Sequence, residues 1–160
     1  MIRVVIADDQ ALMRAAYRMI FEAEPDIELV GEASDGDEAI RVARETSPDV
    51  VIMDVRMPGR NGIEATRVLV SEDRPETRVI MLTTFDMDEY VYDALQAGAS
   101  GFLLKDLPPE QLILGIRAVC RGESLLSPAI TRVVEDSVAL TKAEGQPLTE
   151  LYVMIQRTRC

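Results

Sequence analysis

The sequence contains no histidine, and this absence removes several kinds of chemistry. Without histidine the chain has no His-based nucleophile, no histidine metal site and no phosphohistidine of its own. Two cysteines, Cys120 and Cys160, are too few for a disulfide framework. We expect Cys120 to fill the core on the apolar side of a helix.

Basic residues are also scarce: 17 Lys and Arg are outnumbered by 28 Asp and Glu, which gives a net charge of −11. Such a chain repels phosphate backbones and anionic lipids, so we expect it to bind neither DNA nor a membrane by itself. No apolar run approaches the roughly 20 residues that a membrane span needs. No signal peptide precedes the first strand-like run. We therefore expect a cytoplasmic protein.

Apolar runs alternate with helical patterns, which is typical of βαβ units built around a parallel sheet. Most of these runs are continuously apolar, as strands covered on both faces are, whereas the mixed second run favours an edge strand. With 160 residues, of which 48% are hydrophobic, the chain can form one ordinary domain with a tail. The strands are predicted at residues 2–7, 27–31, 49–53, 78–83 and 101–104.

Five helices are expected between and after these strands. Pro25 ends the first, and Asp35 caps the second, with Glu38 three residues later. Proline at 108–109 suits the first turn of the fifth helix, and Gly122 ends it. The third and fourth helices are predicted over 63–72 and 87–97. The predicted buried stripes are Leu12, Ala16, Met19, Ile20 and Ala23 in the first helix, and Leu112, Ile113, Ile116, Val119 and Cys120 in the fifth.

Polar residues follow four of the apolar runs directly: Asp8 and Asp9, then Asp54, Thr83 and Lys105. If the runs are neighbouring parallel strands, these side chains meet at the carboxyl edge of the sheet, where open α/β folds place their sites. Each residue alone has an ordinary interpretation as a cap, turn or strand end. Their joint placement indicates a site.

Three carboxylates within a few ångströms repel one another strongly, and a bound cation relieves this repulsion. Oxygen ligands without His or Cys favour Mg²⁺, with Mn²⁺ as an alternative. A site neutralised in this way could accept a phosphoryl group, and an aspartate that attacks phosphorus would form an acyl phosphate. Lys105 and Thr83 could then contact the phosphoryl oxygens.

The chain resembles the receiver domain of two-component response regulators. The resemblance covers residues 1–122, with matching order and spacing. Its motifs are Asp8-Asp9, Asp54-Val55-Arg56-Met57-Pro58-Gly59-Arg60-Asn61-Gly62, Leu82-Thr83-Thr84 and Ala97-Gly98-Ala99-Ser100-Gly101-Phe102-Leu103-Leu104-Lys105. It implies a doubly wound, flavodoxin-like five-stranded parallel sheet of order 2-1-3-4-5 with helices on both faces.

The resemblance also implies a role for each site residue. Asp54 would accept the phosphoryl group from a phosphohistidine of a sensor histidine kinase. Mg²⁺ would be held by Asp9, Asp54 and the backbone carbonyl of Arg56, with Asp8 helping through water. Thr83 and Lys105 would contact the phosphoryl group, and Phe102 would be the switch aromatic, although a plain core aromatic is a serious alternative. Arg56 and Phe85 occupy the two positions that tune phosphoryl lifetime, and since neither is a carboxamide or carboxylate, we expect slow self-dephosphorylation.

One departure from the common family pattern is Lys105-Asp106, where many receivers have Lys-Pro. We expect a trans peptide here because a cis bond before a non-proline residue costs roughly 2.5–4 kcal/mol.

Lys105-Asp106 and Pro147-Leu148-Thr149-Glu150 resemble the LuxR/NarL-type subfamily, whose output is a helix-turn-helix. Residues 151–160 do not match that output, so we expect DNA binding only through an output domain absent from this chain, and a shortened or frameshifted end. The expected domains are a receiver at 1–122, a linker at 123–147 with a helix near 128–140, and a remnant at 148–160.

Three other functions compete with this interpretation. A Mg²⁺-dependent aspartyl phosphohydrolase of the haloacid-dehalogenase-like group would have a second Asp two residues after the nucleophile, where this chain has Arg56. A flavodoxin-like redox carrier needs a phosphate-cradling loop after the first strand, where Asp8 and Asp9 lie instead. A phosphorylation-independent interaction module on the same fold stays open. A homodimer on phosphorylation is expected, through the first and fifth helices or the fourth and fifth, and the helix near 128–140 could pack on either chain.

Overall fold

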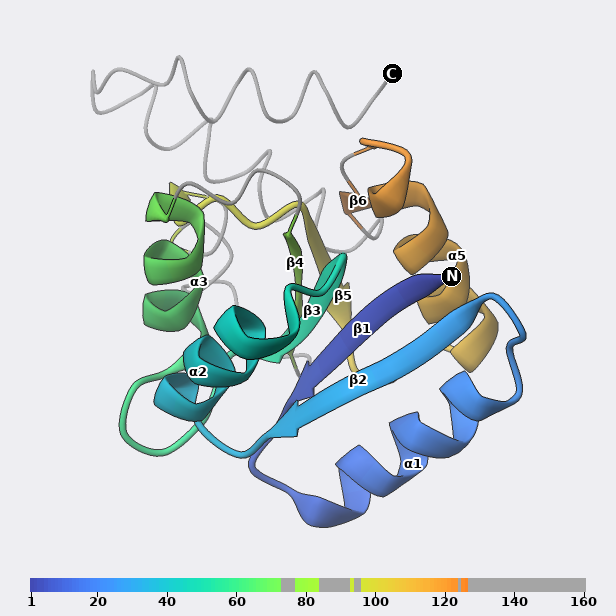
Figure 1. The fold of residues 1–160 in the computed structure, drawn as a ribbon, viewed down its shortest axis with the longest axis horizontal. Coiled ribbons are helices and arrows are strands. Elements are labelled where there is room, and N and C mark those ends of the chain that lie inside the picture. Colours follow the sequence, from blue (N-terminus) through green and yellow to red (C-terminus); the bar gives the residue numbers. More distant parts are fainter. Residues whose placement is uncertain (73–76, 84–92, 94–95, 124, 127–160) are drawn as a thin grey trace.

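The computed structural model describes residues 1–72, 77–83, 93, 96–123 and 125–126. Its strands form one parallel sheet of order β2-β1-β3-β4-β5-β6 (Figure 1). The predicted order of the first five strands is confirmed, and the short sixth strand, which pairs with β5, was not predicted. The strands are β1 (Ile2–Ala7), β2 (Ile27–Ala33), β3 (Val50–Asp54), β4 (Arg78–Thr83), β5 (Gly101–Leu104) and β6 (Leu125–Leu126).

Helices cover both faces of the sheet, α2 and α3 on one side and α1 and α5 on the other (Figure 1). The Asp35 carboxylate caps α2 by accepting from the backbone N–H of Glu38 at 2.8 Å, as predicted. The predicted helix near 128–140, and most of that at 87–97, fall outside the described residues. The described helices are α1 (Ala11–Glu22), α2 (Gly36–Thr46), α3 (Gly62–Ser71) and α5 (Pro109–Cys120).

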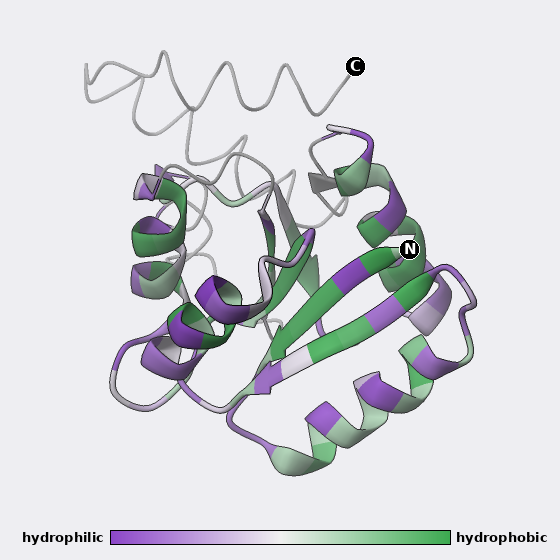
Figure 2. Cartoon of the chain, viewed as in Figure 1, coloured by the Kyte–Doolittle hydropathy of each residue, from purple (hydrophilic) through white to green (hydrophobic). Residues whose placement is uncertain are grey.

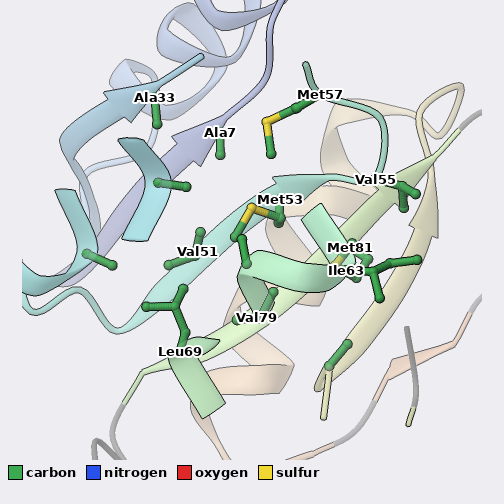
Figure 3. Packing of buried hydrophobic residues seen from close by; sticks show 14 of the residues in the cluster. Ala7, Ala33, Val51, Met53, Val55, Met57, Ile63, Leu69, Val79 and Met81 are labelled. Atoms are coloured by element: carbon green, nitrogen blue, oxygen red, sulfur yellow. The ribbon is translucent and has the colours of Figure 1, made fainter. Parts of the chain in front are cut away.

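The core lies in two layers because successive residues of a strand point to opposite faces. Along β1, Val4 and Ile6 contribute to the layer under α1 and α5, whereas Val5 and Ala7 contribute to the layer under α2 and α3. Figure 3 shows the second layer, where methionines and aliphatic side chains of neighbouring strands pack together on one face of the sheet. The central strands are accordingly hydrophobic and the outer helix faces hydrophilic (Figure 2).

The predicted buried face of α1 is wrong. Leu12 and Met19 are 83% and 73% exposed, and Ala16 and Ala23 are also exposed, while Ile20 is half-buried. The helix instead buries Tyr17 and Phe21, whose rings stack with centroids 6.4 Å apart. Both sets have helical spacing, and the set with two aromatic rings buries more apolar area.

The prediction for Cys120 is also wrong, since this residue is exposed. The other four residues of the predicted stripe on α5 are buried, but the last turn presents Ala118 and Val119 to the core instead of Cys120. Two smaller predictions are confirmed. Strand β2 lies at the sheet edge, and no peptide bond is cis within the described residues, which include Lys105-Asp106.

Candidate functional site

The register of the parallel strands brings the predicted site residues to one edge of the sheet. Ala7 of β1 pairs with Met53 of β3, so the residues that follow, Asp8 and Asp54, lie side by side at the carboxyl ends. On β4, Thr83 pairs with Leu104, and its backbone oxygen accepts from the N–H of Lys105 at 2.7 Å. The polar residues that follow four separate apolar runs therefore lie together at the carboxyl edge of the sheet.

Three carboxylates meet at this edge. Asp8, Asp9 and Asp54 each offer an oxygen, and the three oxygens lie within 4.8 Å of one another. Asp8 and Asp54 are only 1% and 5% exposed, whereas Asp9 faces solvent. An all-oxygen cluster open on one side fits a hard cation such as Mg²⁺, which binds through few carboxylates and keeps several waters.

Lys105 supplies the local positive charge. Its ammonium lies 2.9 Å from an Asp54 oxygen and 3.2 Å from an Asp8 oxygen. Burial disfavours the charged form of Lys105, but the hydrogen bonds and charges of Asp54 and Asp8 outweigh this effect and raise its pKa. The ammonium therefore stays protonated between the two acids and holds both in place.

In spite of this ion pair, the surroundings of Asp54 disfavour the ionised form of its carboxyl. Burial raises the pKa of its carboxyl, the hydrogen bond and charge of Lys105 act in the opposite direction, and the nearby charge of Asp8 raises it further. The net pKa lies above the ordinary value of 3.8. Additional positive charge in the site would favour ionised Asp54, so the electrostatics as well as the ligand types suit a cation.

Within the part of the chain that the structure describes, the hydroxyl of Thr83 has no hydrogen-bond partner, although the residue is only 1% exposed. Buried polar groups without partners are rare and costly, because they lose water and gain nothing in exchange. Thr83 lies at the end of β4, the strand beside that of Asp54. An anionic group attached to Asp54 would offer this hydroxyl an acceptor.

A cavity of about 330 Å³ opens beside the carboxylates. The loop that follows Asp54 forms one wall, and the Arg56 backbone N–H donates to an Asp54 oxygen at 3.4 Å. The cavity offers access from solvent to the acidic edge. Its lining residues are Asp9, Val55, Arg56, Met57 and Asn61.

The remaining predicted residues have less defined surroundings. Phe102 is fully buried in the layer under α2 and α3, a position compatible with either a switch or a core aromatic. Arg56 is exposed at the rim of the cavity. Phe85 lies outside the described residues. The lifetime roles of Arg56 and Phe85 and the metal contact of the Arg56 carbonyl stay predictions.

Sequence reasoning missed Arg14, which donates to the backbone oxygen of Asp8 at 2.6 Å. Arginine on a helix usually indicates a solvated face, and no spacing rule points from position 14 back to the preceding loop. The available signal was its place one helical turn after Gln10, at which distance a long side chain reaches back over the start of the helix.

A comparison with protein families matches residues 4–117 to the response regulator receiver domain. The chain belongs to this family. The match assigns the chain to a family other than those of the phosphohydrolase and the redox carrier considered above. The receiver is of the LuxR/NarL type of two-component response regulators.

Among curated relatives, the uncharacterized transcriptional regulatory protein YxjL of Bacillus subtilis is 49% identical over 124 residues, which are 78% of this chain and 56% of that protein. The oxygen regulatory protein NreC of Staphylococcus haemolyticus is 43% identical over 130 residues, which are 81% of this chain and 59% of NreC. The chain thus spans between half and two thirds of the length of these relatives.

Solved structures agree with the fold. A LuxR-family two-component response regulator from Aurantimonas sp. SI85-9A1 has a TM-score of 0.78 at 37% identity, covering 85% of this chain and 97% of its own. The receiver domain of the putative response regulator NarL from Mycobacterium tuberculosis has a TM-score of 0.73 at 35% identity, covering 76% and 98%. Within the described residues no helix is both long and apolar enough to cross a membrane.

Proposed function

We propose that this receiver stores a phosphoryl group on Asp54 and thereby controls a transcriptional output. The donor is a phosphohistidine on a sensor histidine kinase. The observation that supports this most strongly is the meeting of Asp8, Asp9, Asp54 and Lys105 at one sheet edge. The hydroxyl of Thr83, which has no partner among the described residues, lies on the neighbouring strand. An acceptor that is ionised, accessible and surrounded by groups for an anion is what such a transfer needs.

Asp8, Asp9 and Asp54 would hold Mg²⁺, together with the backbone oxygen of Arg56. The bound ion supplies charge neutralisation for the oxygens of the transferring group. The fit rests on the three oxygens within 4.8 Å and on the raised pKa of Asp54, which the charge of a cation would counter. Mn²⁺ suits the same oxygen ligands.

The transfer itself uses the side chains of the chain directly. An Asp54 oxygen attacks phosphorus as the phosphorus–nitrogen bond to the donor imidazole breaks, and the imidazole leaves with its electron pair and takes up a proton. Lys105 exchanges its Asp54 partner for a phosphoryl oxygen, and it stays paired with Asp8. Thr83 donates its hydroxyl hydrogen to another phosphoryl oxygen, since in the unmodified protein this donor has no acceptor among the described residues. The product is an acyl phosphate with about two added negative charges.

The added charge would then alter the face around Phe102. Movement of Thr83 toward the phosphoryl group leaves space next to the β4–β5 pair, and Phe102 lies on β5 beside Met81 of β4. We propose that this rearrangement favours a homodimer and, in the cytoplasm, controls a LuxR-type DNA-binding domain outside this chain.

The chain catalyses only its own phosphorylation and dephosphorylation. The receiver would span residues 1–122, followed by a linker at 123–147, and residues 148–160 would be a remnant of the entry to the output domain together with a tail that does not match it.

The test is incubation with acetyl phosphate and Mg²⁺ followed by intact-mass measurement. The wild type should gain the mass of one phosphoryl group, and Asp54→Asn should gain none. Asp9→Asn, which keeps the acceptor and removes a metal ligand, should react far more slowly. No mass gain in the wild type, or an equal gain in Asp54→Asn, would leave the phosphorylation-independent interaction module as the better description.

A further inference from the structure

The loop between β1 and α1 carries two of the three acidic side chains, and its conformation is held by a small number of hydrogen bonds. The Asp8 N–H donates to the backbone oxygen of Ala33 on β2 at 2.9 Å. The Gln10 N–H donates to the Asp8 carboxylate at 2.9 Å. The third is the hydrogen bond from the Arg14 guanidinium to the Asp8 backbone oxygen at 2.6 Å. Helix α1 has no side-chain cap at Gln10, so its first turn adds no further anchor to the loop.

Asp9 depends on this loop more than its neighbours do. Lys105 fixes the carboxylates of Asp8 and Asp54, but within the described part of the chain no hydrogen bond or ion pair involves Asp9. Its carboxylate is exposed, and its direction follows from the backbone on either side. A group that fixes the Asp8 carbonyl fixes the peptide that joins Asp8 to Asp9.

Arg14 is itself held in place by Glu32 on β2. The Arg14 Nε lies 3.6 Å from a Glu32 oxygen, and Glu32 directly precedes Ala33, the acceptor for the Asp8 N–H. The same glutamate accepts hydrogen bonds from two nitrogens of Arg18. Nε donates to Oε2 at 3.1 Å, and Nη2 donates to Oε1 at 2.8 Å and to Oε2 at 2.6 Å. Glu32 also offsets the positive charge of Arg14, which would otherwise oppose a cation at the neighbouring carboxylates.

We propose that Arg14 is a positioning residue for the divalent cation. Together with Glu32 it holds the Asp8–Asp9 peptide so that both carboxylates face Asp54. This inference rests on the proposed function, because it assigns a role toward the metal that the proposed phosphoryl transfer uses. Removal of a group that hydrogen-bonds to a metal ligand and orients it typically weakens metal binding by about 10–100-fold.

A purely structural role for Arg14, as a link between α1 and β2, predicts a different result. Arg18 makes the stronger contact with Glu32, and within the described residues it forms no hydrogen bond or ion pair with Asp8. Arg18→Gln therefore removes an α1–β2 link without breaking a hydrogen bond to the acidic loop, which makes it the matched control for Arg14→Gln. Arg14→Lys keeps the charge and offers one ammonium in place of the planar fork.

The experiment measures the Mg²⁺ dissociation constant of the full chain by calorimetry, with urea unfolding in EDTA as a separate report of folding. Arg14→Gln should bind Mg²⁺ about tenfold more weakly, Arg14→Lys should recover part of the loss, and Arg18→Gln should stay within about twofold of the wild type. The amide NMR signals of Asp9 and Gln10 should shift in metal-free Arg14→Gln and not in Arg18→Gln.

Unchanged Mg²⁺ affinity in Arg14→Gln would overturn the inference, as would equal losses in Arg14→Gln and Arg18→Gln. If Arg14→Gln does not fold in EDTA, the comparison passes to Arg14→Lys against Arg18→Lys, with the same expected order of affinities. A wild type that binds no Mg²⁺ would overturn the proposed function and this inference together. A wild type that binds Mg²⁺ with an unaffected Arg14→Gln overturns the inference alone.

Discussion

The ammonium of Lys105 lies 2.9 Å from the carboxylate of Asp54, and this contact joins the last residue of β3 to the residue that follows β5. The same ammonium lies 3.2 Å from Asp8. The Lys105 ammonium therefore lies between two buried carboxylates. Phosphorylation of Asp54 would replace one of these acids with a group of higher charge on the same side chain.

Replacement of Lys105 by Met should reduce the free energy of unfolding by roughly 3 kcal/mol without metal, because two buried carboxylates lose their cation. Urea unfolding in EDTA measures this loss, and saturating Mg²⁺ should restore part of it. Arg41→Met is the control, since among the described residues Arg41 pairs at the surface with Glu38 and Glu45 alone, and its loss should cost less than about 1 kcal/mol. Equal losses in the two variants would contradict the account.

Asp54→Asn should stabilise the metal-free protein at neutral pH, by an amount of the order of 1 kcal/mol. The folded pKa of Asp54 lies above its ordinary 3.8, so the folded state holds this proton more tightly than the unfolded state does. Ionisation of Asp54 therefore costs no stability well below pH 3.8; the cost accumulates as pH rises from 3.8 to the folded pKa and is constant above it. Urea unfolding in EDTA at several pH values should show that the free energy of unfolding of the variant increases relative to that of the wild type as pH rises from 3.8. A constant difference would refute this electrostatic argument.

Thr83→Val should leave the unphosphorylated protein as stable as the wild type or up to about 1 kcal/mol more stable, since it removes an unsatisfied buried hydroxyl and keeps the shape. Thr83→Ala should cost about 1 kcal/mol because it also removes a buried methyl group. In both variants the stabilisation that beryllofluoride and Mg²⁺ give the wild type should decrease. Thermal unfolding with and without beryllofluoride tests this, and a full response in Thr83→Val would mean that the hydroxyl does not bond the phosphoryl group.

Gly62→Ala should destabilise the protein by roughly 3 kcal/mol, because a Cβ at this position would overlap the backbone oxygen of Asp54 at the start of α3. The overlap also displaces the acceptor residue, so phosphorylation should slow beyond the effect on folding. Gly59→Ala is the control: its φ of +68° makes alanine cost about 1 kcal/mol, but no atom of the described residues lies within 4 Å of the added Cβ. Chemical denaturation and phosphorylation rates measured on both variants would show whether the site effect is specific to position 62.

The sequence allowed accurate prediction where one physical requirement dominates. Strands β1, β4 and β5 have the predicted ends, because continuous apolar runs between polar residues have few alternative conformations in a sheet covered on both faces. The site followed from the strands: once they are parallel and in register, the polar residue after each run must reach the same edge. Helix caps such as Asp35 were predictable because capping is local.

Predictions failed where two patterns competed or where a contact was not local. Two faces of α1 have helical spacing, and the sheet selected the one with Tyr17 and Phe21 over that with Leu12 and Met19. Strand β6 has only two residues and forms by pairing with Gly101 and Phe102 of β5, a partner that its own sequence does not specify. The role of Arg14 depends on the position of Asp8 and Glu32 in space, which only the fold provides.

The most direct test of the central claim is the location of the phosphoryl group after reaction with acetyl phosphate and Mg²⁺. Borohydride reduces an aspartyl phosphate to homoserine, so peptide mass mapping identifies the modified residue. The account predicts homoserine at position 54, dependent on both phosphodonor and Mg²⁺. Homoserine at Asp8 or Asp9, or no conversion in a folded protein, would contradict it.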